Sequence, residues 1–98
     1  MSAFCYIIFS HKLNRFYTGA CHDNLDERIR KHNSHEYGSH RFTATTDDWV
    51  LFLAIPSKDY AHALRMEKTI KATKSSVFIK NLKKYPELQD KLFLKTSN

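Results

Sequence analysis

The chain has 98 residues, of which 42% are hydrophobic and 13% aromatic, and 16 Lys and Arg outnumber 10 Asp and Glu to give a net charge of +6. This length favours a single domain with one core, and no apolar run approaches the roughly 18 residues that a membrane-spanning helix needs. The start of the chain, MSAFCYIIF, lacks the basic segment of a signal peptide, so we expect a cytoplasmic protein with no membrane partner. The excess of positive charge favours nucleic acid as partner.

Two strands joined by a short turn are predicted at the start of the chain. Phe4–Ser10 and Arg15–Ala20 are rich in aromatic and β-branched residues, which favours strands. The intervening HKLN ends in Asn14, which tolerates left-handed geometry, so an antiparallel hairpin is the expected connection. Because side chains alternate along a strand, Tyr6 and Tyr17 each lie on one face of their own strand. The sequence leaves open whether the two faces coincide.

A helix follows, with a capping-box pattern at Asn24 and Glu27 and an expected end at His32 or Asn33. Arg28 and His32 fall on the same stripe as two apolar residues, and this stripe would normally pack on the core. A long cation on such a face is uncommon unless it is paired or faces a cleft. The charged end of Arg28 could also reach the helix edge.

A polar stretch and an apolar run come next. Ser34–Asp48 contains Gly38 and has no periodicity, so it is predicted to be a loop of about 15 residues, long enough to suggest function or mobility. Trp49–Ile55 is an unbroken apolar run that Pro56 stops. Such a run suits a strand buried on both faces, and we expect it at the centre of the sheet.

The first of three later helices is predicted to follow Ser57 and to extend to about Thr73. One stripe of this helix holds Tyr60, Ala63, Leu64, Glu67, Ile70 and Lys71. Glu67 therefore lies in the middle of the expected buried face, where a carboxylate is costly unless a cation, hydrogen bonds or a metal compensates it. An ordinary ion pair, with Lys71 one turn later or with Arg28, would explain it as well as a metal would.

The last two helices are short. Ser75 or Ser76 is expected to cap one that ends at Tyr85, and Pro86 suits the first position of the other. The whole chain, residues 1–98, is predicted to be one domain with a core at about 4–83 and a short helix and tail at 84–98.

The unusual polar residues share a chemistry. They are Tyr6, Tyr17, Arg28, His32 and Glu67. Phosphodiester hydrolysis needs a base for the attacking water, positive charge at the scissile phosphate, and usually a divalent metal held by carboxylate. A single carboxylate, with water and phosphate oxygens completing the coordination shell, is typical of Mg²⁺.

The stretch YIIFSHKLNRFYTG resembles the paired motif of the GIY-YIG nuclease superfamily, with Tyr6 ending the first motif and Tyr17 opening the second. The likeness continues through LDERIRKHN, FTATTDDWVLF and ALRMEKTIK, and so spans about Cys5 to Leu82. The chain looks most like the small stand-alone members that are similar to the N-terminal nuclease domain of the bacterial excinuclease.

This resemblance implies an α+β fold, an α/β sandwich in which a three-stranded antiparallel sheet is flanked by helices. It also implies an endonuclease that cuts DNA rather than RNA, in repair or recombination, with Mg²⁺ or Mn²⁺ as cofactor. Tyr17 would be the general base or part of its relay, Tyr6 would position water or phosphate, and Arg28 would stabilise the phosphoryl charge. His32 would assist proton transfer, and Glu67 would be the sole protein ligand of the metal. Tyrosine ordinarily ionises near pH 10, so a base role requires a nearby cation, for which Arg28 and the metal are candidates.

The chain departs from the family pattern in four places. The first motif reads FCY, and one extra residue precedes Arg28. Ala20 and Cys21 stand where some members carry a lysine. The late asparagine of the family has only Asn81 as a candidate counterpart.

Two alternatives remain open. A zinc site could use Cys21, His22, His32, His35 and His40, although the spacing matches no recurrent zinc finger. A non-catalytic module could bind nucleic acid through the basic residues, for which the candidates are Arg30, Lys31, Arg41, Lys68, Lys71 and Lys74, with Arg65, Lys80, Lys83 and Lys84 nearby on the helices. For a nuclease, target choice would come from the cleft of the domain itself and the loop at 34–48, or from a protein partner.

Overall fold

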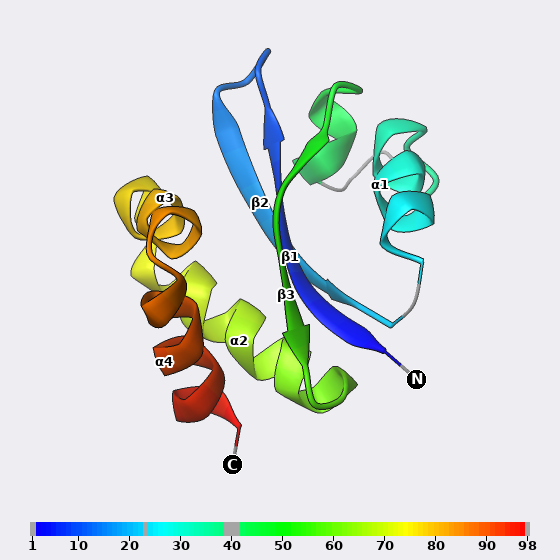
Figure 1. Ribbon diagram of the computed structural model, residues 1–98. Coiled ribbons are helices and arrows are strands. Elements are labelled where there is room, and N and C mark those ends of the chain that lie inside the picture. Colours follow the sequence, from blue (N-terminus) through cyan, green and yellow to red (C-terminus); the bar gives the residue numbers. More distant parts are fainter. Residues whose placement is uncertain (1, 23, 39–41, 98) are drawn as a thin grey trace.

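The computed structural model describes residues 2–22, 24–38 and 42–97. Its elements in chain order are β1 (Ala3–Ser10), β2 (Arg15–Cys21), α1 (Leu25–Asn33), a short 3-10 helix η1 (Phe42–Thr45), β3 (Val50–Ser57), α2 (Tyr60–Thr73), α3 (Ser76–Lys84) and α4 (Pro86–Thr96). The strands form one antiparallel sheet, with α1 on one face and α2, α3 and α4 on the other (Figure 1). The predicted α+β fold is therefore confirmed.

The prediction that Trp49–Ile55 forms the centre of the sheet is wrong. The strand order is β2-β1-β3, so β1 is the central strand and β3 is an edge. Val50 and Leu51 are 47% and 44% exposed, and the strand continues through Pro56. An edge strand tolerates a proline because a missing N–H there breaks no ladder bond to a further strand.

Each face of the sheet packs its own apolar cluster. Among the described residues, the α2–α4 side buries Cys5, Ile7, Ile55, Met66, Ile70, Ile79, Leu82 and Leu92. The α1 side buries Tyr6, Ile8, Cys21 and Trp49. The sheet is thus covered on both faces, with the smaller cluster on the side of α1.

The expected buried stripe of α2 is partly wrong. Leu64 is 43% exposed, whereas His62 and Met66 have no exposed surface. The imidazole of His62 can be buried because its polar atoms are satisfied. Its Nδ1 accepts from the N–H of Lys58 at 3.0 Å, and its Nε2 lies 3.1 Å from the carbonyl oxygen of Phe93. Internal hydrogen bonding thus lets α2 turn a polar residue toward the core, which apolar periodicity does not reveal.

Helix α1 begins as its capping residue predicts. The Asn24 side chain accepts from the N–H of Glu27 at 3.3 Å. The carboxylate of Glu27 does not return to Asn24 to complete a capping box. It pairs with Arg30 at 2.5 Å, one turn further along the helix. The predicted bounds of the helix agree with the structure.

The segment predicted to be a loop, residues 34–48, is anchored at its C-terminal end, which lies in the described part of the chain. The side chain of Asn33 brackets the backbone of Trp49, accepting its N–H at 2.7 Å and donating to its carbonyl at 3.0 Å. Asp48 accepts from the Ser10 hydroxyl at 2.5 Å and from the Lys12 N–H at 3.0 Å. The segment therefore fastens to the hairpin and to α1.

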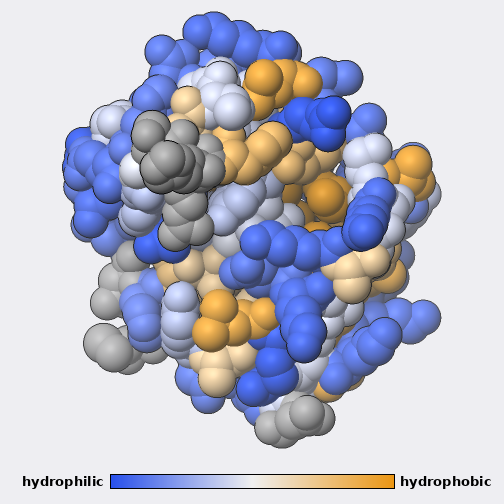
Figure 2. Space-filling view, turned by 180° about the vertical axis from the view of Figure 1, so that it is seen from behind, coloured by the Kyte–Doolittle hydropathy of each residue, from blue (hydrophilic) through white to orange (hydrophobic). Residues whose placement is uncertain are grey.

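Large apolar side chains reach the surface singly. The exposed ones are Phe42, Val50, Leu51, Leu64, Val77, Tyr85 and Leu94. Seen from behind, hydrophobic side chains emerge in separate patches among hydrophilic ones (Figure 2). None of the helices within the described ranges combines the length and the apolarity that crossing a membrane would require.

Candidate active site

The register of the hairpin brings the two tyrosines to one face of the sheet. Tyr6 lies opposite Gly19 and Ile8 opposite Tyr17, so both phenols project toward α1. A Cβ at Gly19 would lie 2.5 Å from the Tyr6 hydroxyl and 2.6 Å from its Cζ. Glycine is therefore required at this position for the Tyr6 ring to lie across β2.

Tyr6 connects the two polar residues of α1. Its hydroxyl oxygen lies 2.8 Å from His32 Nε2 and 3.3 Å from Arg28 Nε. Arginine can only donate, so the oxygen accepts from Arg28. In the His32 tautomer that leaves Nε2 unprotonated, the Tyr6 hydroxyl donates to Nε2 and the Nδ1–H donates to the hydroxyl of Thr43 in η1, 2.9 Å away. The network runs from Arg28 through Tyr6 and His32 to Thr43.

Burial determines what Tyr6 can do. Its side chain has no exposed surface. Burial raises the pKa of the Tyr6 phenol well above its ordinary value, although the Arg28 hydrogen bond acts in the opposite direction. Tyr6 therefore keeps its proton at neutral pH. Direct contact with water or phosphate, the role that the resemblance implies, would need surface that this side chain does not expose.

Aromatic rings enclose His32. The ring of Tyr17 meets it edge-on with centroids 5.4 Å apart, and the ring of Tyr37 lies 4.8 Å away. The guanidinium carbon of Arg28 lies 4.7 Å from the centroid of Tyr37, within cation–π range. No sequence pattern identifies Tyr37 or Thr43. Their only signal is the unusual length of the predicted loop that contains them.

Lys71 joins Glu67 to Tyr17. Its Nζ lies 2.8 Å from Glu67 Oε2 and 5.0 Å from the centroid of the Tyr17 ring. The side chains of Lys71 and Glu67 are 46% and 21% exposed, so the carboxylate is half-buried. Glu67 thus forms with Lys71, one helical turn away, the ion pair that the spacing allowed. Helix α2 places this pair beside Tyr17 on β2.

A divalent metal fits the donor set at Glu67. Its carboxylate offers hard oxygen ligands, and Mg²⁺ is commonly held by one or two carboxylates with water and phosphate oxygens. Within residues 2–22, 24–38 and 42–97, no group of three or more His, Cys, Asp or Glu side chains is gathered. A metal at Glu67 would therefore depend on substrate and solvent for its other ligands.

The residues of the alternative zinc site are engaged elsewhere. His22 stacks on Tyr60 with ring centroids 4.2 Å apart. His35 Nε2 lies 2.9 Å from the carbonyl oxygen of Thr46, and both ring nitrogens of His32 lie within hydrogen-bonding distance of hydroxyls. His40 lies outside the described residues. The structure gives the zinc site no support.

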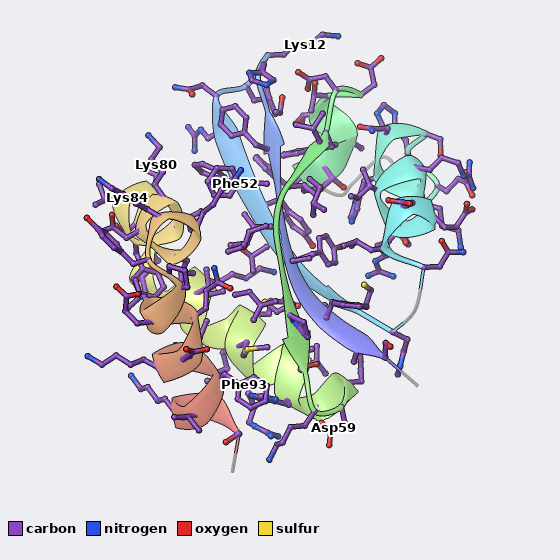
Figure 3. All side chains as sticks on the ribbon, viewed as in Figure 1. Lys12, Phe52, Asp59, Lys80, Lys84 and Phe93 are labelled. Carbon is purple, nitrogen blue, oxygen red and sulfur yellow. The ribbon has the colours of Figure 1, made fainter. Side chains whose placement is uncertain are left out.

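The remaining predicted residues are dispersed. Arg30 forms exposed ion pairs with Glu27 and Glu36, and Arg65 donates to a carbonyl of α4, 2.6 Å away. Lys80 and Lys84 project outward from α3 (Figure 3). Arg41, predicted to bind nucleic acid, lies outside the described residues.

Asn81 does not join the candidate site. It lines a hollow with Tyr85 and Leu88, where α3 meets α4. This position gives no support to Asn81 as the counterpart of the family's late asparagine.

Comparison with known proteins gives one match. Residues 2–84 match the model of the GIY-YIG catalytic domain. No curated protein and no solved structure matches the chain. The matched range extends from β1 through α3 and includes both tyrosines, Arg28, His32 and Glu67.

Proposed function

Because the chain belongs to the GIY-YIG catalytic domain family, we propose that it is a metal-dependent endonuclease that hydrolyses phosphodiester bonds in DNA. The observation that supports this most is the convergence of side chains from β1, α1 and α2 around Tyr17 of the edge strand β2. There the Arg28–Tyr6–His32 network packs against Tyr17, which the Lys71–Glu67 pair reaches from α2.

Arg28 is the group best suited to the scissile phosphate. Its Nε donates to Tyr6, which leaves four of the five guanidinium N–H groups for other acceptors. A planar pair of such donors matches two phosphate oxygens. Tyr6 holds the guanidinium and so acts as a positioning residue in this proposal.

Tyr17 and His32 are the candidates for moving the proton. Tyr17 keeps part of its surface exposed at the sheet edge, whereas Tyr6 and His32 are buried. We therefore assign to Tyr17 the acceptance of a proton from the attacking water. The His32 ring, fixed between two hydroxyls and packed on the Tyr17 ring, orients it.

Glu67 would hold the metal, either Mg²⁺ or Mn²⁺. When bound, the ion supplies Lewis-acid stabilisation of the phosphoryl oxygens and a water of lowered pKa. Lys71 pairs with Oε2 of the carboxylate at 2.8 Å, and Oε1 is the oxygen that would hold the ion.

The type of nucleic acid and the biological role are inferred from the family resemblance alone. Resemblance to the excinuclease domain favours DNA over RNA and a role in repair or recombination, and we also propose a cytoplasmic location. A protein partner that selects the target belongs to the same proposal.

The test is cleavage by the purified protein of plasmid, single-stranded and branched DNA with Mg²⁺ or Mn²⁺ and with chelator. Glu67→Gln should lower the cleavage rate by about a hundredfold or more, the scale seen when one transition-state-stabilising group is removed. Glu87→Gln, which alters an exposed carboxylate on α4, is the matched control and should cleave normally. Cleavage that survives both chelator and Glu67→Gln would refute the proposal.

A non-catalytic binding module is the second candidate. The observation that favours it is the ion pair that already compensates Glu67. Retention of DNA in a gel shift at low salt, without metal-dependent cleavage of any substrate, would support this alternative.

A further inference from the structure

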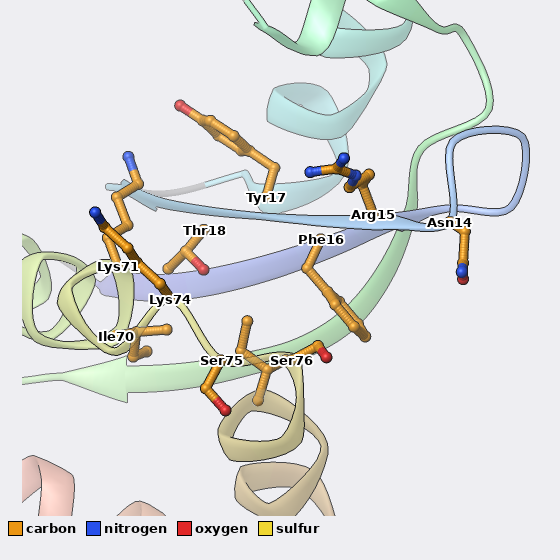
Figure 4. A pocket seen from close by; sticks show the side chains of 11 residues that line it. Asn14, Arg15, Phe16, Tyr17, Thr18, Ile70, Lys71, Lys74, Ser75 and Ser76 are labelled. Atoms are coloured by element: carbon orange, nitrogen blue, oxygen red, sulfur yellow. The ribbon is translucent and has the colours of Figure 1, made fainter.

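A hollow of about 550 Å³ opens beside Tyr17, between β2 and the junction of α2 with α3 (Figure 4). Three of its lining residues, Arg15, Lys71 and Lys74, are cationic, and none of the described residues that line it is Asp or Glu. Tyr17 itself forms part of the wall. The hollow is therefore a positively charged recess that adjoins the residue to which we assign the proton transfer.

Two of the three cations have no carboxylate partner in the part of the chain that the structure describes. The ion pairs found there involve Lys12, Arg30 and Lys71. Arg15 and Lys74 are exposed and belong to none of them. Their charge is available to an anion, whereas that of Lys71 is shared with Glu67.

The backbone fixes where these cations stand. Lys74 ends α2 with a left-handed φ of 48°, which few residues other than glycine adopt, and its N–H bonds the Lys71 carbonyl at 3.2 Å. The chain then enters α3 directly, where the Ser75 hydroxyl accepts the N–H of Phe78 at 3.1 Å. Arg15 is held on β2 by its pairing with Ser10. The recess is thus formed by regular elements and a tight junction.

The spacing along β2 suits a nucleic-acid strand. Arg15 and Tyr17 lie on the α1 side of β2, two residues and about 7 Å apart, whereas Lys71 and Lys74 approach the edge of β2 from the end of α2. This separation is comparable to that of neighbouring phosphates on one strand. Lys71 lies against Tyr17 and also lines the recess, so it connects the two positions.

We propose that the recess binds the phosphate next to the one that is cleaved, and so forms a substrate-binding subsite beside the scissile diester. The inference rests on the proposed function and adds a binding subsite to it. Arg15 and Lys74 hold the neighbouring phosphate, and in doing so they fix the register of the strand on Tyr17.

The test compares two double variants of the full chain. Arg15→Gln with Lys74→Gln removes the two free cations of the recess. Lys91→Gln with Lys95→Gln removes the same charge from exposed positions on α4, which packs on α2 and α3 and contributes nothing to the recess. The probes are a short fluorescein-labelled oligodeoxynucleotide and bis(p-nitrophenyl) phosphate, which carries a single diester and no neighbour.

The recess variant should lose about tenfold or more in kcat/KM on the oligonucleotide, the effect of losing a hydrogen bond to a charged group. Its hydrolysis of bis(p-nitrophenyl) phosphate should not change, and the α4 variant should match the parent on both probes. Fluorescence anisotropy with chelator present should show the same loss of oligonucleotide affinity. The plot of log affinity against log salt should also become less steep, by about 0.7 for each phosphate contact to a single strand that is lost.

Two outcomes would overturn the subsite. One is an equal loss of oligonucleotide affinity in the recess and α4 variants, which would indicate net charge alone. The other is an equal loss of hydrolysis on both probes. The conservative double variant Arg15→Lys with Lys74→Arg keeps both positive charges and should retain affinity. It therefore separates the effect of the lost charges from an effect of misfolding. Absence of cleavage by the parent would refute the proposed function, whereas the anisotropy comparison would still decide the subsite.

Discussion

Gly19 faces Tyr6 across the β1–β2 pair, and the phenol occupies the space where a side chain at position 19 would begin. The ring cannot swing away freely, because it is fully buried and bonded to Arg28 and His32. Gly19→Ala should therefore lower the free energy of unfolding by about 1–3 kcal/mol, the usual cost of overpacking a core. Urea unfolding measures this loss, and DNA cleavage should fall with it because the Tyr6 network is displaced.

Gly38→Ala provides the contrast. Gly38 has a φ of +100°, and nothing in the described part of the chain lies within 4 Å of an added Cβ, so the variant incurs backbone strain without a clash there. It should lose about 1–2 kcal/mol and leave cleavage by the folded protein unchanged. Tyr6→Phe in the Gly19→Ala background should restore little of the stability, because Cζ of the ring still lies 2.6 Å from the added Cβ. A Gly19→Ala protein as stable and active as the parent would contradict this account of the motif glycine.

Local signals were sufficient for the hairpin and α1 but not for the order of strands. The caps, turns and alternation that define those elements lie within a few residues of each other in the chain. Which strand is central depends on long-range pairing, and the apolar run of β3 suggested a centre that β1 occupies instead. Pro56 carried the contrary signal, because a proline within a strand favours an edge.

The candidate site was predictable in its residue types and not in its connections. Arg28, His32 and Glu67 were identifiable because each is a charged or titratable residue on a stripe that should be apolar. The Tyr6–His32 bond depends on hairpin register, and the approach of Tyr37 to Arg28 depends on the path of a long loop. Neither is encoded in a local pattern.

The attachment of the 34–48 segment to the hairpin should be sensitive to acid. The Ser10 hydroxyl, with the Lys12 N–H and the Thr46 hydroxyl, holds the pKa of Asp48 well below its usual range. A carboxyl whose pKa is lower in the folded state contributes stability above its unfolded pKa of about 4 and loses it as the pH falls through the folded value. The free energy of unfolding should therefore decrease below about pH 4 in part because of Asp48.

Asp48→Asn isolates this contribution. Near neutral pH the variant should be less stable than the parent, and the difference should shrink as the pH falls below about 4, because the parent then loses the same interaction. Asp90→Asn, at an exposed position on α4, should differ little from the parent throughout. Urea unfolding across the pH range measures both, and a gap for Asp48→Asn that did not change with pH would show that ionisation of Asp48 is not involved.

The two layers of the molecule are unequal in size. Among the described residues, eight are buried in the cluster on the α2–α4 side and four in the cluster on the α1 side. Because stability follows the apolar surface that is buried, α1 and the segment after it should open at a lower free-energy cost than α2–α4. The candidate site is built largely on this less stable layer, with Glu67 and Lys71 contributed by the other.

The two cysteines report on the layers separately, since Cys5 belongs to the larger cluster and Cys21 to the smaller. Burial above all raises the pKa of the Cys5 thiol to about 12, so this thiol stays protonated and inert until the structure opens. In single-cysteine variants at low denaturant, Cys21 of Cys5→Ala should react with a disulfide reagent at least about tenfold faster than Cys5 of Cys21→Ala, equivalent to an opening cheaper by about 1.4 kcal/mol. In high denaturant the two rates should converge, which controls for intrinsic reactivity. Equal rates at low denaturant, both following global unfolding, would instead show that the layers open as one cooperative unit because they share the sheet.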